Sequence, residues 1–177
     1  MLEENIIKKC IQGDRVAQGN LYSFYASRTY GICIRYAGSS FEAEDILQDA
    51  FIKIFNRLGS FNMDGSFDGW IKRIVINTAI DHYNANAKKN NHIHLELLKD
   101  YDLEYVPETT DLHEEDLLNM LSKLPHGYKM VFNLYAIEGF SHKEIATMLN
   151  ITEGTSKSQL SKARRHLQSL LHINNIA

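Results

Sequence analysis

Hydroxyl and basic side chains recur at helical spacing near the end of this chain, in residues 141–168. The pattern predicts two short helices joined by a tight turn, and the second helix is the basic one. Its outer face would carry Lys157, Ser158, Ser161, Lys162 and Arg165. Cations at such positions can contact phosphates and guanine edges, and short hydroxyl side chains let a helix approach the DNA major groove closely. An ordinary solvated helix pair is the alternative, because Lys and Arg are common on outer faces.

The turn between these two helices has its own signals. Ser141 stands three residues before Glu144, which is the spacing of a capping box at a helix start. Asn150 can adopt the left-handed conformation that ends a helix, and Thr152 can cap the next one. Apolar side chains would face inward from both helices: Ile145, Ala146, Met148, Leu149, Leu160, Ala163 and Leu167. Together these features predict a helix-turn-helix.

Charge is distributed unevenly along the 177 residues. Residues 150–172 hold four basic side chains against Glu153 alone, a net charge of +3, so the remainder carries −6 within a total of −3. The net charge of the whole chain therefore does not indicate a DNA-binding protein. The local distribution supports DNA contact by the C-terminal segment.

Several classes of protein and site are not indicated. The first residues are charged and lack the apolar core of a signal peptide, and no run approaches the roughly 18 apolar residues that cross a bilayer. We therefore expect a cytoplasmic protein without membrane insertion. Cys10 and Cys33 have apolar neighbours and are predicted to be core thiols, and the dispersed histidines, of which His92 and His94 are the closest pair, predict no metal site. No nucleophile–base pair or phosphate-binding loop is present, so neither catalysis nor a cofactor is expected.

Apolar periodicity predicts an all-α chain of two small helical domains. In the first, helical patterning breaks near Gly13, a broad buried stripe runs from Ile46 to Leu58, and a loop at 59–69 leads into a helix from Trp70 to about Asn84. Residues 95–116 then contain nine acids and only Lys99 as a base, which is typical of a flexible linker.

Further amphipathic helices follow that acidic stretch, one ended by Pro125 and another closed by Gly139. The predicted organisation is therefore one domain at 1–90, an acidic linker at 91–112 and a second domain at 113–172.

An acidic surface is predicted on the helix at 41–51, which has four acids and no base. Asp45, Gln48 and Asp49 recur at three- and four-residue steps, suited to docking against a basic partner helix. Alternatively, Glu42, Glu44 and Asp45 only favour the helix N-terminus through its dipole. That explanation accounts less well for Asp49, which lies further into the helix.

The loop after this helix combines glycine, short polar groups, Phe61 and Phe67. Trp70, Arg73, Asn77 and Asp81 follow it at steps of three or four, hence on one face of the next helix. An aromatic ring, a guanidinium and an amide beside a loop can stack on and hydrogen-bond unstacked bases. Taken singly, each aromatic side chain could instead anchor the loop to the core.

Together these segments resemble an extracytoplasmic-function sigma factor, the small two-domain bacterial transcription initiation factor of the sigma-70 family. AEDILQDAFIKIF at 43–55 is similar to the polymerase-binding helix of region 2, and FDGWIKRIVINTAID at 67–81 to the promoter-melting helix. Residues 124–164 are similar to region 4. The resemblance covers nearly the whole chain and implies a protein that binds core RNA polymerase, directs it to promoters and assists opening of the −10 duplex.

The resemblance also implies a partner for each surface. The β′ clamp helices of core RNA polymerase would be bound by Glu44, Asp45, Gln48 and Asp49. The unpaired −10 strand would be bound by Phe61, Asn62 and Asp64 in the loop and by Trp70, Arg73, Asn77 and Asp81 after it. The −35 element in promoter DNA would be contacted by Thr155, Lys157, Ser158, Ser161, Lys162, Arg164 and Arg165. Alternatively, the two arginines would lie against the β flap of the polymerase. An anti-sigma factor would be a further protein partner.

The chain departs from the family pattern at three places. Ser156 stands where many members have a β-branched apolar residue, Asn150 stands where glycine is frequent, and HYNANA follows Asp81 where basic residues usually follow. Weaker or displaced duplex contacts are expected after Asp81. A stand-alone helix-turn-helix regulator, binding DNA as a dimer without polymerase, is the alternative function, and it would leave the acidic helix unused.

Overall fold

The computed structural model of this chain describes residues 4–62, 65–89 and 114–174. Within these ranges the structure consists of helices and their connections and contains no strand, which confirms the all-α prediction. The chain divides into two compact units, Met1–Asn86 and Ala87–Ala177. The predicted linker at 91–112 and the pair His92 and His94 lie outside the described residues.

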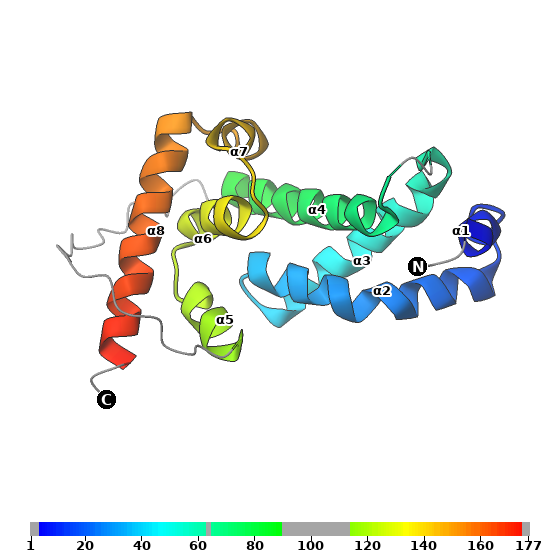
Figure 1. Cartoon of the computed structure of the whole chain (residues 1–177), viewed down its shortest axis with the longest axis horizontal. Helices are drawn as coiled ribbons and strands as arrows, with labels where there is room; N and C mark the ends of the chain where they lie inside the picture. The colour runs from blue at the N-terminus through cyan, green and yellow to red at the C-terminus, as the bar shows by residue number, and fades with distance from the viewer. Residues whose placement is uncertain (1–3, 63–64, 90–113, 175–177) are drawn as a thin grey trace. The chain divides into compact units, whose positions relative to one another are not determined.

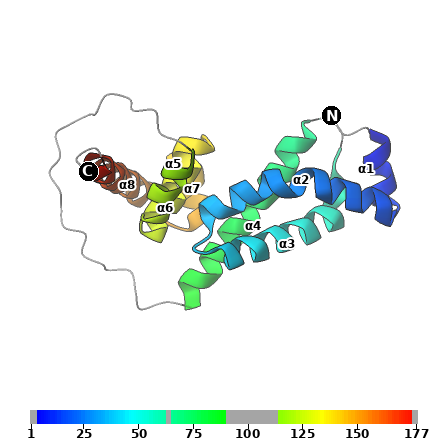
Figure 2. The same ribbon diagram turned by 90° about the horizontal axis from the view of Figure 1, so that it is seen from below.

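Long helices build the N-terminal unit (Figures 1 and 2). Its elements are α1 (Glu4–Ile11), α2 (Arg15–Tyr36), α3 (Ser40–Arg57), the 3-10 turn η1 (Leu58–Ser60) and α4 (Phe67–Lys89). The break expected near Gly13 is confirmed: its φ is 83°, and the Asp14 carboxylate caps α2 by accepting the N–H groups of Val16 at 2.9 Å and Ala17 at 3.0 Å.

Apolar faces of α2, α3 and α4 meet in the core of this unit. The bulky side chains that are essentially inaccessible to solvent there are Leu21, Tyr36, Ile46, Ile54, Leu58, Ile71 and Val75. Cys10 and Cys33 are free and buried, which confirms the prediction of core thiols. Burial raises the pKa of the Cys33 thiol to about 12, so this side chain stays protonated at neutral pH.

The loop before α4 is shorter than the sequence suggested. The helix expected from Trp70 begins at Phe67, because Ser66 caps it: the Ser66 hydroxyl accepts the Gly69 N–H at 3.2 Å and its carbonyl accepts the Trp70 N–H at 3.0 Å. The glycines at 65 and 69 led to the wrong boundary. At its other end α4 runs on to Lys89, beyond the predicted end at Asn84.

Shorter helices pack around one long helix in the C-terminal unit. Its elements are α5 (Glu114–Ser122), α6 (His126–Phe132), the π-helical turn η2 (Asn133–Ile137), α7 (His142–Leu149) and α8 (Glu153–Asn174). Pro125 precedes α6, and Gly139, with φ of 80°, ends the helical run after η2 as predicted.

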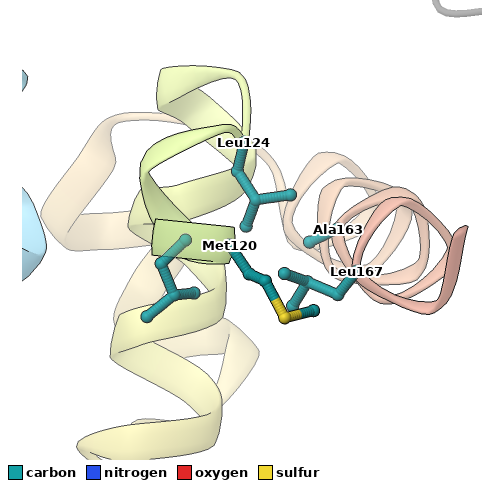
Figure 3. Packing of buried hydrophobic residues seen from close by; sticks show 5 residues of the cluster. Met120, Leu124, Ala163 and Leu167 are labelled. Atoms are coloured by element: carbon teal, nitrogen blue, oxygen red, sulfur yellow. The ribbon is translucent and has the colours of Figure 1, made fainter. Parts of the chain in front are cut away.

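The cluster that holds α5 against α8 consists of Met120, Leu121, Leu124, Ala163 and Leu167, all of them buried (Figure 3). Ala163 is the smallest member, which lets the two helices approach closely, and Leu124 and Leu167 fill the space beside it. Each leucine contributes about 1.5–3 kcal/mol by leaving water. Among the described residues, no helix is long and apolar enough to cross a bilayer.

Candidate functional site

The corner between α7 and α8 is built as the sequence predicted. The Ser141 side chain accepts the Glu144 N–H at 3.3 Å, and the Glu144 carboxylate accepts the Ser141 N–H at 2.8 Å, which completes the capping box. Asn150 adopts the left-handed conformation, with φ of 54° and ψ of 48°. The Thr152 hydroxyl accepts the Thr155 N–H at 3.0 Å and so caps α8. Local signals therefore position α8.

One face of α8 is buried and the other is open. Leu160, Ala163 and Leu167 lie in the core, as predicted. The exposed side chains are Lys157, Ser158, Ser161, Lys162, Arg164 and Arg165. Thr155 is only half-buried, but its hydroxyl lies 2.8 Å from that of Thr152, so it takes part in the cap. The open face thus presents cations between short hydroxyl side chains, a composition that suits phosphates and base edges.

A polar contact fills the buried corner behind this face. Ser156 is fully buried, and its hydroxyl lies 2.9 Å from Nδ1 of His142 at the start of α7. The His142 ring stacks on Tyr135 with centroids 4.5 Å apart, and the Arg164 guanidinium lies 5.9 Å from the centroid of the Tyr135 ring. Arg164 is therefore oriented partly by its own domain. No signal in the sequence connects Tyr135 with Arg164.

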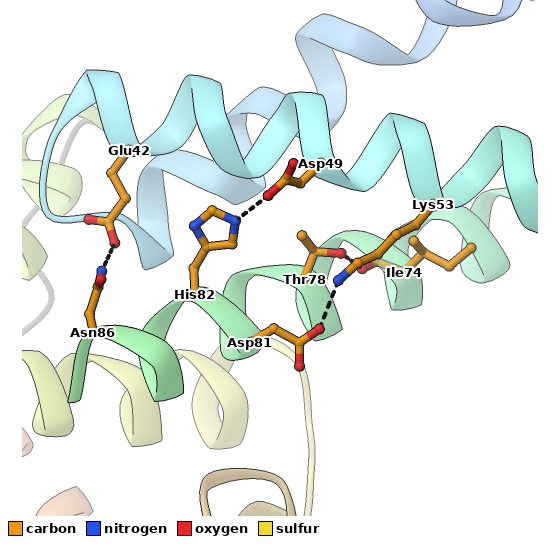
Figure 4. Close-up of polar contacts among 8 residues, drawn as sticks. All are labelled: Glu42, Asp49, Lys53, Ile74, Thr78, Asp81, His82 and Asn86. Carbon is orange, nitrogen blue, oxygen red and sulfur yellow. Dashed lines mark hydrogen bonds and ion pairs between the residues drawn. The ribbon is translucent and has the colours of Figure 1, made fainter. Parts of the chain in front are cut away.

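The acidic candidates on α3 separate into two groups. Glu44, Gln48 and Asp49 are exposed and Asp45 is half-buried, and Asp49 also lies 2.8 Å from Nε2 of His82 on α4 (Figure 4). Asp49 therefore borders the seam between α3 and α4 while its side chain stays 54% exposed, one helical turn from Asp45.

Two further polar contacts follow the same seam (Figure 4). Lys53 donates to Asp81 at 2.8 Å, and Asn86 donates to Glu42 at 2.9 Å. The Asp81 carboxylate, expected at the −10 strand, is thus engaged by Lys53 of its own unit. These contacts accompany the packing of α4 against α3. Buried apolar residues of α4 lie next to them and supply most of the packing energy.

An aromatic cluster joins Phe61 to the start of α4. Phe61 lies 5.1 Å from Phe67 and 5.5 Å from Trp70, and Phe67 and Trp70 are stacked at 5.7 Å between ring centroids. Asn62 is exposed beside these rings, while Asp64 lies outside the described residues. Arg73 and Asn77 are exposed on the following turns of α4. Half-buried rings next to exposed amide and guanidinium groups can both hold the loop and offer a stacking surface.

Sequence reasoning missed the contact that joins α2 to the start of α4. The Tyr25 hydroxyl donates to Asp68, and its ring meets Phe67 edge-on at 5.8 Å. Burial, followed by the bond to Asp68, raises the pKa of Tyr25, so the hydroxyl keeps the proton that it donates. Tyr25 and Asp68 are 43 positions apart, and no local spacing could have paired them.

No group of three or more His, Cys, Asp or Glu side chains suited to a metal ion gathers among the residues that the structure describes. A surface cavity of about 230 Å³ lies between α2 and α4, lined by Tyr25, Arg28, Thr29, Ile32, Asp68, Ile71 and Lys72.

Comparisons with protein families match both units. Residues 21–89 match the family model described as "Sigma-70 region 2", and residues 114–167 match "Sigma-70, region 4". The chain is 30% identical over 183 residues to "ECF RNA polymerase sigma factor SigW" of Bacillus subtilis, covering 97% of each chain. It is 27% identical to "RNA polymerase sigma-H factor" of Pseudomonas aeruginosa, covering 96% of this chain and 93% of that protein.

Solved structures with a similar fold include the sigma factor RpoE of Bartonella quintana, in a co-crystal with the anti-sigma factor NepR. It has a TM-score of 0.53 and 22% identity, and the match covers 88% of this chain and 96% of that chain. CnrH, in complex with the cytosolic domain of CnrY, has a TM-score of 0.50 and 22% identity over 95% of this chain and 96% of that one. At this identity the two likenesses establish the fold.

Proposed function

The chain belongs to the extracytoplasmic-function sigma factors of the sigma-70 family, and from this premise we propose how its surfaces divide the work of transcription initiation. The exposed residues of α3 bind core RNA polymerase. The loop before α4, together with Asn77, holds an unpaired base of the −10 element. The open face of α8 contacts the −35 element.

The observation that carries this proposal is the separation of charge between two exposed helix faces. On α3, Glu44, Asp45 and Gln48 are at least partly accessible, and they suit a basic protein surface. On α8, Lys157 and Lys162 flank the exposed hydroxyls of Ser158 and Ser161, and they suit a phosphate backbone and the base edges beside it.

The region around Trp70 supports single-strand binding. Flipping a base out of the duplex costs a few kcal/mol of stacking and pairing, and contacts between the base and the protein must offset this cost. Phe61 and Trp70 are half-buried and mutually packed, so they offer a pre-formed aromatic surface, and the exposed amide of Asn77 can hydrogen-bond a base edge. Asp81 accepts from Lys53 of its own unit, and its side chain is 66% exposed, so it stays open to the bound strand.

The protein acts in this scheme as a specificity factor in the cytoplasm, and the polymerase performs the chemistry of RNA synthesis. An anti-sigma factor is a further partner, in line with the sigma factor RpoE, which was crystallised with the anti-sigma factor NepR. Such a partner would compete with polymerase for the α3 surface.

Co-elution with core RNA polymerase tests the proposal. We expect the wild-type chain to run with core polymerase on gel filtration and to support run-off transcription from promoter-bearing genomic fragments. Asp45→Lys should abolish co-elution, because a positive charge would face a basic surface. Asn20→Lys, which introduces the same lysine side chain at an exposed position of α2, is the control and should co-elute normally.

A chain that binds duplex DNA as a dimer but never runs with polymerase would contradict the proposal and favour a stand-alone regulator. Unchanged co-elution of Asp45→Lys would remove α3 from the interface. Circular dichroism melting of each variant confirms that the fold is intact.

A further inference from the structure

The helix α3 has three distinguishable faces. Ala43, Ile46, Ala50 and Ile54 are buried in the core. Glu42, Asp49 and Lys53 follow the seam with α4. The remaining outer face is defined by Phe41, Asp45, Gln48 and Ile52, which follow one another at spacings of four, three and four. This spacing places the four side chains in one line on the helix surface.

Both ends of this outer face are apolar and unusually exposed. Phe41 is 72% exposed and Ile52 is 58% exposed. Among the large apolar side chains that the structure describes, only Val16, at 73% on α2, is as exposed as Phe41. A single exposed apolar residue is common on any protein. Two on one helix face, beside acidic side chains, mark a surface that another molecule covers.

We propose that Phe41 and Ile52 are the two apolar anchors with which α3 binds core RNA polymerase, each inserting into an apolar recess of a helical partner surface. The inference rests on the proposed function and deepens it, because charge alone was assigned to this contact above. Interfaces of this kind are depleted of charge at their most buried positions and enriched in aromatic side chains, and a few such residues supply most of the binding energy.

The geometry specifies the partner surface. Ile52 lies eleven helical steps after Phe41, which corresponds to roughly 16 Å at 1.5 Å per residue. Three turns of a partner helix packed alongside α3 span the same length. The partner must therefore offer two apolar recesses about three turns apart. Cations must lie between them, opposite Asp45 and beside Glu44, so that the acidic side chains are paired and not merely desolvated.

The two kinds of side chain should affect different rate constants. Acidic groups at an interface steer association, and their effect weakens as salt rises. Buried apolar anchors act mainly on dissociation and depend little on salt. Truncating Phe41 or Ile52 should therefore increase the dissociation rate and leave the salt dependence of binding close to wild type.

The test measures the Kd and dissociation rate of the full-length chain on reconstituted core polymerase at low and moderate salt. The variants are Phe41→Ala, Ile52→Ala and the double variant. The matched control is Val16→Ala, which removes an equally exposed apolar side chain from α2. We expect each single variant to weaken binding about tenfold, through faster dissociation, and the control to stay within about twofold.

The outcomes separate this inference from the proposed function. If the double variant binds within twofold of wild type while Asp45→Lys abolishes binding, the anchors are wrong and the function stands. If neither change weakens binding, both are wrong. If the wild-type chain dimerises without polymerase and Phe41→Ala abolishes the dimer, the outer face is a contact between copies, and the inference is overturned. Because Phe41 and Ile52 are exposed, melting temperatures close to wild type are expected and confirm that loss of binding is not unfolding.

Discussion

The Ser156 hydroxyl lies 2.9 Å from Nδ1 of His142, and this contact joins α8 to α7 inside the helix-turn-helix. Ser156 is fully buried, so a polar contact occupies the corner between the two helices. His142 in turn stacks on Tyr135. The departure at position 156 thus has a structural partner, which maintains the angle between the two helices.

Removing this hydroxyl should weaken the C-terminal unit. Ser156→Ala deletes the bond to His142, and the net loss for one such bond is about 1 kcal/mol of unfolding free energy. Urea unfolding followed by circular dichroism measures the change. Ser158→Ala serves as the control, because the exposed Ser158 hydroxyl only donates to the Thr155 carbonyl at 3.0 Å; its effect should stay below about 0.5 kcal/mol. Equal effects of the two substitutions would show that the buried contact contributes nothing.

The left-handed residue at the end of α7 should respond oppositely to two small substitutions. Asn150 has φ of 54°, a region that glycine enters freely and alanine avoids. Asn150→Gly should leave stability unchanged or raise it slightly, whereas Asn150→Ala should cost roughly 1 kcal/mol. The difference in melting temperature between the two variants is the measurement. Alanine matching glycine would mean that the turn relaxes to another conformation.

Neutralising lysines on α8 should change the salt dependence of promoter binding. Lys157→Ala and Lys162→Ala should each weaken binding and reduce the slope of log K against log salt by about one, as each removes one phosphate contact. Lys123→Ala, at an exposed position just after α5, is the control with the same charge change. Fluorescence anisotropy of the holoenzyme on −35 duplex DNA supplies the slopes. A slope equal to wild type in both α8 variants would contradict these contacts.

The ion pair between Lys53 and Asp81 should contribute little to stability despite its 2.8 Å separation. Both side chains are partly exposed, 34% and 66%, and such pairs are worth about 0.2–1 kcal/mol. A double-mutant cycle of Lys53→Met and Asp81→Asn should give a coupling in this range that disappears in about 1 M salt. A coupling well above it would mean that the seam is more shielded from solvent than its exposure indicates.

Alkaline pH should destabilise the N-terminal unit. Burial raises the pKa of the Cys33 thiol to about 12, whereas an unfolded thiol titrates near its ordinary value of 9.0. The stabilisation is therefore complete below about pH 9 and is lost as the pH rises toward 12. Unfolding free energy measured between these values should fall, and Cys33→Ala should flatten the decline. Burial and the bond to Asp68 also raise the pKa of the Tyr25 hydroxyl, which contributes in the same direction.

At neutral pH both buried thiols should react with alkylating agents only on unfolding.

Local features of the fold followed from the sequence. The capping box of Ser141 and Glu144, the left-handed Asn150 and the cap at Thr152 depend on partners within four residues, and the inward face of α8 follows from apolar spacing along one helix. Spacing alone therefore predicts them. The predicted start of α4 at Trp70 was wrong, because loop glycines suggested a later helix start and the cap at Ser66 places it at Phe67.

Periodicity and composition are local properties, and they were enough to predict an all-helical chain with basic charge gathered on one helix and acidic charge on another. Four contacts became visible only in the folded chain: Tyr25 with Asp68, Lys53 with Asp81, Asp49 with His82 and Glu42 with Asn86. These partners are 28 to 44 positions apart, and their meeting depends on how whole helices rotate against one another as their apolar faces pack. The same packing turns Asp49 toward α4 and leaves Phe41 and Ile52 exposed on the outer face of α3.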